Sequence, residues 1–268
     1  MQPFSQCPLS ILENIRAVLT DIDDTITSHG LLPSGSIRAM EKLSDAGILV
    51  IPVTGRPAGW CDHIARMWPV DAVVGENGAL YFSYDRKLKQ MNKCFAKSEA
   101  EREGDRAKLN KLAKEILNQV PGAGLASDQD YRVADLAIDF CEDVPPLSSE
   151  EIDKIQEILQ SGGATTKVSS IHVNAWFGSY DKMTMSRQCL KDLFSMDIES
   201  ENDKILFTGD SPNDSPMFAY FNNSVGVSNI MNFSLPPDHE PAYVTDQPDS
   251  LGFASVAEAI LNARNKLN

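Results

Sequence analysis

Three short segments of this sequence place acidic, hydroxyl or amide side chains directly after a run of apolar residues. They are Thr20-Asp21-Ile22-Asp23-Asp24-Thr25, Val53-Thr54-Gly55-Arg56 and Gly209-Asp210-Ser211-Pro212-Asn213-Asp214. Ligands bind beyond the carboxyl ends of the strands in an open parallel sheet. If the apolar runs are neighbouring strands, several carboxylates meet at one point, and their mutual repulsion calls for a bound cation. Oxygen ligands without His or Cys favour a hard ion such as Mg²⁺.

The elements that must position these segments alternate along the chain between strand and helix patterns. Strands are predicted at 16–20, 48–53, 71–74, 204–208, 224–227 and 242–245, and helices at 36–46, 58–67, 184–196, 212–220 and 254–266. Strands that alternate with helices indicate a parallel sheet covered on both faces. The predicted fold class is therefore α/β, with a Rossmann-like, doubly wound parallel-sheet core.

The middle of the chain follows a different pattern. Glu76-Asn77-Gly78 predicts a tight hairpin turn, and a strand is predicted to follow it at 79–84. Beyond it we expect a long polar helix, a strand, a helix opened by a capping box at Ser148 and Glu151, and two more strands. We therefore predict three parts: the first part of the core at 1–84, an inserted α+β cap domain at 85–177, and the second part of the core at 178–268.

In their order and spacing, the three polar segments resemble the motifs of the haloacid dehalogenase superfamily. The segment that begins at Asp21 is similar to its DxDxT signature, Thr54 to its second motif, and the segment from Gly209 to Asp214 to its GDxxND motif. The insert resembles a C2-type cap of the C2B kind. The resemblance covers both halves of the core and is nearest to Cof-like, sucrose-phosphate and mannosyl-3-phosphoglycerate phosphatases. It implies a phosphatase that acts with Mg²⁺ on a sugar phosphate.

The four acids of these segments receive the following predicted roles. A carboxylate can attack phosphorus when a cation offsets the repulsion between two anions, so Asp21 is the predicted nucleophile. Asp23 is expected to protonate the leaving alcohol and then to activate the water that hydrolyses the aspartyl-phosphate. Asp210 and Asp214 are the expected metal ligands together with Asp21, and the resemblance adds the main-chain carbonyl of Asp23.

Phosphate oxygens are expected to be held by Thr54, the Gly55 amide and Asn213, while Arg56 either supports the site or anchors loops. The resemblance also implies a lysine whose charge offsets the phosphate and the acids. Lys182 is the preferred candidate, although Met183 follows it where relatives usually have Gly, and Lys191 is the alternative.

The last predicted strand of the insert, 171–177, alternates in side-chain character. His172, Asn174 and Trp176 share one face of it, because successive side chains of a strand point to opposite faces. That mixture of polar and aromatic groups suits the recognition of a sugar, so these three residues are candidates for substrate specificity. A half-exposed sheet face with a packed Trp is the alternative interpretation.

Composition restricts the partners. The chain has 268 residues, with 24 Lys and Arg against 38 Asp and Glu, for a net charge of −14. This balance argues against nucleic acid and anionic membranes as partners and leaves a small phosphorylated metabolite. The five cysteines form no CxxC pair, and no apolar run reaches membrane-spanning length, so a cytoplasmic location is expected. Nothing in the sequence predicts the oligomeric state.

Two alternatives to a phosphatase remain open at this point. A phosphomutase would use the same nucleophile but exclude water from the aspartyl-phosphate. A non-catalytic binding protein on the same scaffold is disfavoured by the complete set of acids. Adjacent acids are often only turn or cap residues, and Asp24 is assigned such a structural role.

Overall fold

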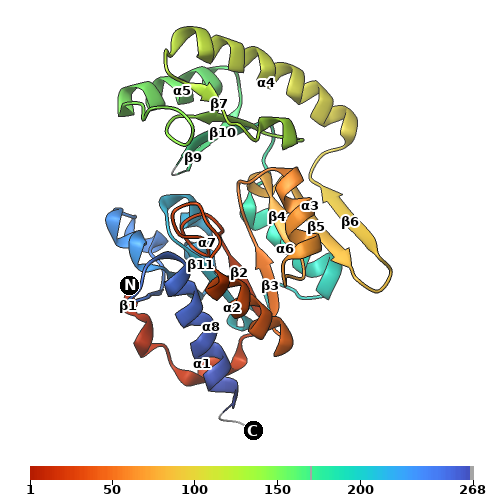
Figure 1. Ribbon diagram of the computed structural model, residues 1–268, viewed down its shortest axis with the longest axis vertical. Helices are drawn as coiled ribbons and strands as arrows, with labels where there is room; N and C mark the ends of the chain where they lie inside the picture. Colours follow the sequence, from red (N-terminus) through yellow and green to blue (C-terminus); the bar gives the residue numbers. More distant parts are fainter. Residues whose placement is uncertain (170, 266–268) are drawn as a thin grey trace.

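The computed structural model describes residues 1–169 and 171–265 of the chain (Figure 1). Its central sheet contains six strands in the order β1-β13-β12-β11-β2-β3, and every neighbouring pair in it is parallel. The strands are Gln2–Pro3 (β1), Tyr243–Val244 (β13), Asn223–Gly226 (β12), Ile205–Gly209 (β11), Ala17–Thr20 (β2) and Leu49–Pro52 (β3). The predicted α/β class is confirmed. Because β2 lies between β11 and β3, the three strands that precede the polar segments are adjacent.

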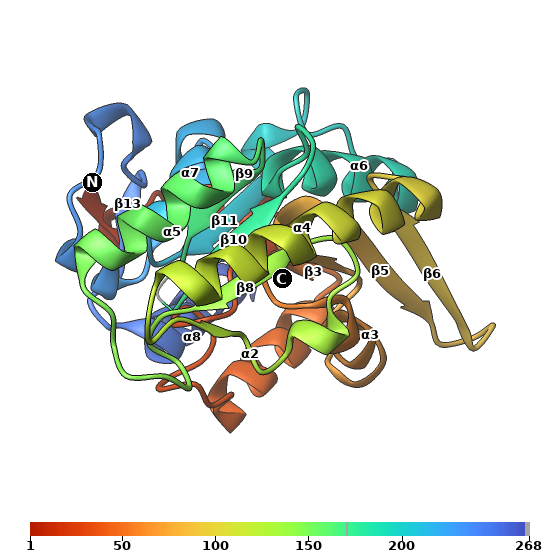
Figure 2. The ribbon, with the colours of Figure 1, turned by 90° about the horizontal axis from the view of Figure 1, so that it is seen from above.

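Helices cover both faces of this sheet, and the strand residues alternate between the two sides. Val18, on β2, packs in a cluster with residues of α1 (Leu9–Asn14), α2 (Ser34–Asp45), α3 (Ala58–Met67) and α8 (Asp249–Asn265). Leu19, the next residue of β2, packs with residues of α6 (Lys182–Phe194) and α7 (Ser215–Tyr220). Both views show α2 and α8 side by side (Figures 1 and 2). This sheet therefore has the two covered faces that the sequence predicted.

A small antiparallel sheet continues the core beyond β3. It contains β4 (Val73–Gly75), β5 (Leu80–Asp85) and β6 (Gln90–Phe95), and a single parallel bridge from Val53 to Val74 links β3 to β4. The predicted turn at Glu76-Asn77-Gly78 does connect β4 to β5. β6 was not predicted, because it is a polar, half-exposed edge strand whose sequence lacks an apolar alternation. It pairs with β5 beside the core.

The remainder of the insert forms a separate antiparallel sheet in the order β7-β8-β10-β9, which we call the insert sheet. Its strands are Gly124–Leu125 (β7), Leu136–Asp139 (β8), His172–Trp176 (β10) and Thr165–Val168 (β9). Two helices, α4 (Glu99–Gln119) and α5 (Ser149–Ser161), cover its outer face, and each begins with a capping box. The sheet lies over the core, with both helices outermost (Figures 1 and 2). The domain limits and the C2B kind of cap stay predictions.

Three predicted helices, α2, α6 and α8, begin earlier than the sequence indicated. Helix α6 begins at Lys182, because the side chain of Asp181 accepts a hydrogen bond from the Thr184 amide and caps the helix. Helix α8 begins at Asp249, and Gly252 in its first turn weakened the helical pattern there. A Cβ at Gly252 would collide with Thr245 and Gln247, so close packing requires this glycine. The predicted end of α8, Lys266, lies outside the described residues.

Candidate active site

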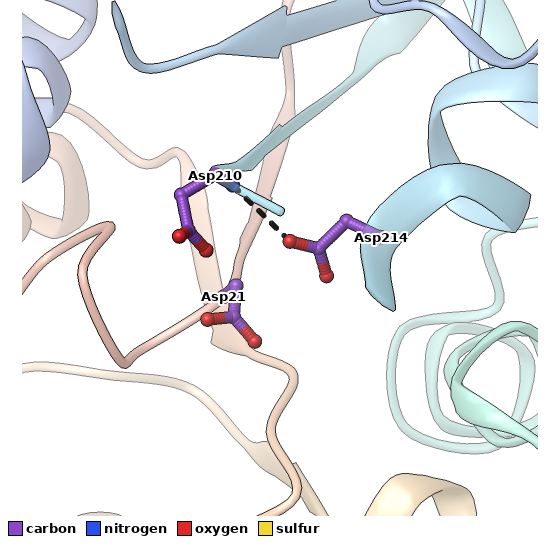
Figure 3. A group of neighbouring side chains, drawn as sticks. All are labelled: Asp21, Asp210 and Asp214. Atoms are coloured by element: carbon purple, nitrogen blue, oxygen red, sulfur yellow. Dashed lines mark hydrogen bonds between the residues drawn. The ribbon is translucent and has the colours of Figure 1, made fainter. Parts of the chain in front are cut away.

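Three buried carboxylates gather where β2 and β11 end. Asp21 directly follows β2, Asp210 directly follows β11, and Asp214 closes the short turn after Asp210. Each offers an oxygen atom, and these atoms all lie within 4.8 Å of one another (Figure 3). At most 6% of any of the three residues is exposed. The structure thus brings together the predicted nucleophile and two of the predicted metal ligands.

The backbone around β11 explains why this arrangement needs its glycine. The Asp21 amide donates to the Thr208 carbonyl at 2.9 Å, which fixes the end of β2 against β11. The Asp210 amide donates to Oδ2 of Asp214 at 3.2 Å, so the turn folds back towards the strand. A Cβ at Gly209 would lie 2.5 Å from the same carboxylate oxygen. Any larger residue at Gly209 would therefore displace Asp214.

Lys182 supplies the positive charge of the cluster. Its Nζ lies 2.7 Å from Oδ1 of Asp21 and 2.9 Å from Oδ1 of Asp214. Gly78 packs so closely against the first residues of α6 that a Cβ there would collide with the backbone at Asp181 and Lys182. Lys191, the alternative candidate, is exposed on the same helix. Of the two candidates, only Lys182 is in contact with the acids.

Electrostatics in this cluster favour a bound cation. Burial raises the pKa of Asp21 to about 8, although Lys182 opposes the shift, and burial with the charge of Asp21 raises the pKa of Asp210 to about 9. Burial alone would lower the pKa of Lys182, but Asp21 and Asp214 outweigh it and raise that pKa. One ammonium therefore faces three carboxylates. This all-oxygen donor set fits a hard divalent cation such as Mg²⁺.

The carboxylate of Asp23, the predicted acid and base, is hydrogen-bonded to Arg56. Nε and Nη2 of Arg56 donate to the Asp23 carboxylate at 3.1 and 2.8 Å. The same Nη2 donates to Oε1 of Glu142, in the insert, at 3.1 Å. Oε2 of Glu142 lies 2.9 Å from Nε2 of His172. A chain of polar contacts therefore runs from Asp23 in the core to His172 in the insert.

The predicted phosphate-binding residues divide into two groups. Gly55 and Asn213 line one cavity together with Asp21, Asp23 and Asp210. A Cβ at Gly55 would press against the Asn77 side chain at 3.2 Å. Thr54 is fully buried, and its hydroxyl accepts a hydrogen bond from the Arg56 amide at 3.0 Å. The Thr54 side chain thereby shapes the loop that carries Gly55 and Arg56.

The three candidate specificity residues lie on β10, on the face of the insert sheet that is turned towards the core. His172 and Asn174 line the cavity that contains Asp21, and Nδ2 of Asn174 donates to Oδ2 of Asp135 at 3.2 Å. Trp176 stacks on Tyr180 with ring centroids 5.9 Å apart, and its Nε1 donates to the Tyr180 carbonyl. The opposite residues of β10, Val173 and Ala175, pack beneath α4 and α5. Trp176 is thus a packed residue as well as part of this face.

Sequence reasoning missed the role of Glu76. The segment is a turn as predicted, but the Glu76 side chain is fully buried. Its carboxylate accepts hydrogen bonds at 2.7 to 3.1 Å from four backbone amides, those of Ala58, Val133, Ala134 and Asp135. Three of these amides belong to the insert, so Glu76 fastens the insert to the core. The available signal was an acid directly after a buried strand, β4.

Asn229 and Arg132 were also missed. Nδ2 of Asn229 donates to Oδ2 of Asp210 at 3.3 Å and to the Asp24 carbonyl at 3.0 Å, which orients the metal-ligand candidate and the loop after β2. The buried guanidinium of Arg132 donates to the Gly55 carbonyl and to Asp135. Asn229 follows the predicted strand 224–227, as site residues often do. No local pattern marks Arg132.

Comparisons with known proteins identify a family profile and several similar proteins. The sequence profile of the haloacid dehalogenase-like hydrolases matches residues 18–116. The phosphoglycolate phosphatase of Thermoplasma acidophilum is 24% identical over 206 residues, which cover 76% of this chain and 81% of that protein. A solved structure of a Thermoplasma acidophilum protein superimposes with a TM-score of 0.70 at 20% identity and covers 92% of this chain and 98% of its own.

A fourth similarity is to the sucrose-phosphatase of Synechocystis, solved in complex with sucrose and phosphate. It has a TM-score of 0.60 at 16% identity, and the match covers 92% of this chain and 97% of that one. Within the described part of the chain, no helix combines the length and the apolar character that crossing a membrane requires. The family profile over residues 18–116 and the acids at the strand ends agree: the chain is similar to the haloacid dehalogenase-like hydrolases, and these similarities support an enzyme of the phosphatase type.

Proposed function

We propose that the protein is a Mg²⁺-dependent phosphomonoester hydrolase that acts on a small phosphorylated metabolite, a sugar phosphate, through an aspartyl-phosphate at Asp21. One observation carries the proposal: Nζ of Lys182 contacts both Asp21 and Asp214 at the ends of adjacent parallel strands, beside Asp210. A buried carboxylate beside an ammonium and two further acids suits an attack on an anionic ester once a cation is bound.

The reaction divides into two steps. In the first, an Asp21 oxygen bonds to phosphorus, the ester bond breaks, and Asp23 gives its proton to the leaving oxygen. In the second, Asp23 takes a proton from water, whose oxygen bonds to phosphorus and releases Asp21 and inorganic phosphate. Mg²⁺ held by Asp21, Asp210, Asp214 and the Asp23 carbonyl would offset the charge of the phosphoryl group. Lys182 is proposed to stabilise the same charge and to keep Asp21 ionised.

Phosphate oxygens are proposed to bind at Gly55 and Asn213, which line the cavity beside Asp21, and Thr54 is proposed to shape the loop that carries Gly55. The leaving group would then extend towards the insert, where His172 and Asn174 line the same cavity. The related proteins carry names with different substrates, phosphoglycolate and sucrose phosphate, so the leaving group is not transferred from either. A cytoplasmic location remains part of the proposal.

The test compares Asp21→Asn with Asp24→Asn, a carboxylate of the same loop that lies outside the cluster. Asp24 has a positive φ of 55°, which Asn adopts readily, so the control should fold normally. Phosphate release from a panel of phosphorylated metabolites is measured with EDTA and with Mg²⁺. We expect wild type and Asp24→Asn to need Mg²⁺, and Asp21→Asn to lose about 10³-fold in rate, about 4 kcal/mol. Equal rates for the two variants would contradict the proposal.

A further inference from the structure

A second cavity lies beside the proposed phosphate site. Its volume is about 330 Å³, and Lys182, Asn77 and Asn213 line it. Asn77 and Asn213 also line the cavity that contains Asp21, so the two cavities are adjacent. Residues of the insert sheet, including Lys167 and Trp176, line this second cavity as well. A leaving group that extends from a phosphate at Asp21 towards the insert would reach this space.

Lys167 lies on the face of β9 that looks into this cavity. In the pairing of β9 with β10, Lys167 is directly opposite Asn174, and directly opposed residues project from the same face of a sheet. Asn174 lines the cavity that contains Asp21. The Lys167 side chain is therefore part of the face that also bears His172 and Trp176.

Lys167 differs from the other cations around the site in having no counter-ion. Lys182 is paired with Asp21 and Asp214, and Arg56 and Arg132 also contact carboxylates. Among the described residues, no carboxylate lies within 4.0 Å of the Lys167 Nζ. Burial lowers the pKa of Lys167 and the charge of Lys182 lowers it further, while Asp214 and Asp181 raise it without forming an ion pair, so that the net shift is downward. A half-buried amine without a partner is costly, and a bound anion would relieve that cost.

We propose that Lys167 binds a second anionic group on the leaving group, so that the preferred substrate carries a carboxylate or a further phosphate besides the phosphate that is cleaved. This inference rests on the proposed function and narrows its substrate class. It also accounts for selectivity in a chain with a net charge of −14, which would otherwise repel a multiply charged substrate. Lys167 would act on binding and orientation, not on the reacting atoms.

The test uses substrate pairs that differ mainly in the second anion. 3-Phosphoglycerate is paired with glycerol 3-phosphate for the carboxylate, and fructose 1,6-bisphosphate with fructose 6-phosphate for the further phosphate. The value of kcat/KM is measured with Mg²⁺ for wild type, Lys167→Met, Lys167→Arg and Lys111→Met. Lys111→Met removes the same charge from the exposed surface of α4 and serves as the matched control. Circular dichroism checks that each variant is folded.

We expect wild type to prefer the anionic member of at least one pair by about tenfold or more. Lys167→Met should reduce that preference by about tenfold, mainly through KM, Lys167→Arg should restore part of it, and Lys111→Met should keep it. The substrate pair whose preference falls in Lys167→Met identifies whether Lys167 binds a carboxylate or a phosphate. No preference in wild type, or an equal loss on both members of a pair in Lys167→Met, would overturn the inference.

p-Nitrophenyl phosphate, which has no second anion, separates this result from the proposed function. If wild type hydrolyses p-nitrophenyl phosphate with Mg²⁺ but prefers neither anionic substrate, the proposed function stands and the role of Lys167 is refuted. If wild type hydrolyses no phosphomonoester at all, both fail together.

Discussion

At the scale of single residues, the position of Asp23 depends on Arg56. Asp23 is only partly buried, and its carboxylate is held by Nε and Nη2 of Arg56 from the loop after β3. The flat guanidinium fixes both the place and the direction of the carboxylate, which a lysine ammonium could not do. Proton transfer to the leaving oxygen is sensitive to such placement. Arg56 is thus a positioning residue for the proposed acid and base.

We therefore expect Arg56→Lys to lower kcat by about tenfold or more, with a smaller change in KM. Steady-state kinetics measure kcat and KM separately. Arg66→Lys, at an exposed ion pair with Asp62, is the control and should match wild type. An unchanged kcat in Arg56→Lys would contradict this role.

At the scale of elements, the turn between β4 and β5 joins the core to the insert. Glu76 binds three amides of the segment before β8, and Gly78 of the same turn packs against the start of α6. One turn thereby helps to place both the insert and Lys182.

Glu76→Ala would remove the acceptor of four backbone amides, two of them buried and two part-buried, so we expect a loss of about 3 kcal/mol or more in the free energy of unfolding. Urea unfolding with Mg²⁺ present provides the measurement. Glu103→Ala, an exposed acid on α4, should stay within about 0.5 kcal/mol of wild type. Similar unfolding midpoints for the two variants would show that the amides find other partners.

The sequence predicted the parts of this site that follow local rules. Asp21 and Asp210 each directly follow a short apolar strand, and parallel strands bring their carboxyl ends to one edge. Three of the four partners of Glu76, by contrast, lie more than fifty positions away along the chain. Arg132 and Lys167 lie near the site only because the insert packs over the core, and no sequence periodicity predicts that packing. The edge strand β6 was missed because pairing with β5, not apolar character, holds it.

At the scale of the whole molecule, protons and metal compete for the buried acids. The folded protein without metal raises the pKa of Asp21 to about 8 and of Asp210 to about 9, both chiefly by burial. Because these pKa values exceed the ordinary value of 3.8 for an aspartate, the protonated acids favour folding at low pH, and that contribution is lost as pH rises through 8 to 9. Metal binding requires the ionised acids, so it becomes stronger as pH rises.

The melting temperature in EDTA should therefore fall between pH 6 and pH 9, and Mg²⁺ should restore more of it at pH 9. We expect the increase caused by Mg²⁺ to be larger at pH 9 than at pH 6 by about 2 °C or more. NaCl at equal ionic strength controls for screening. Asp210→Asn should abolish the increase. An increase that is smaller at pH 9 would contradict competition between protons and metal.

A covalent bond between Asp21 and phosphorus can be trapped chemically. The enzyme is mixed with substrate and Mg²⁺, quenched in acid during turnover and reduced with borohydride, which converts an aspartyl-phosphate to homoserine. Mass spectrometry then examines the peptide that contains residue 21. We expect homoserine at this position in wild type, with none in unreacted enzyme or in Asp21→Asn. Homoserine at a different aspartate, or turnover without any reducible aspartate, would contradict a covalent bond at Asp21.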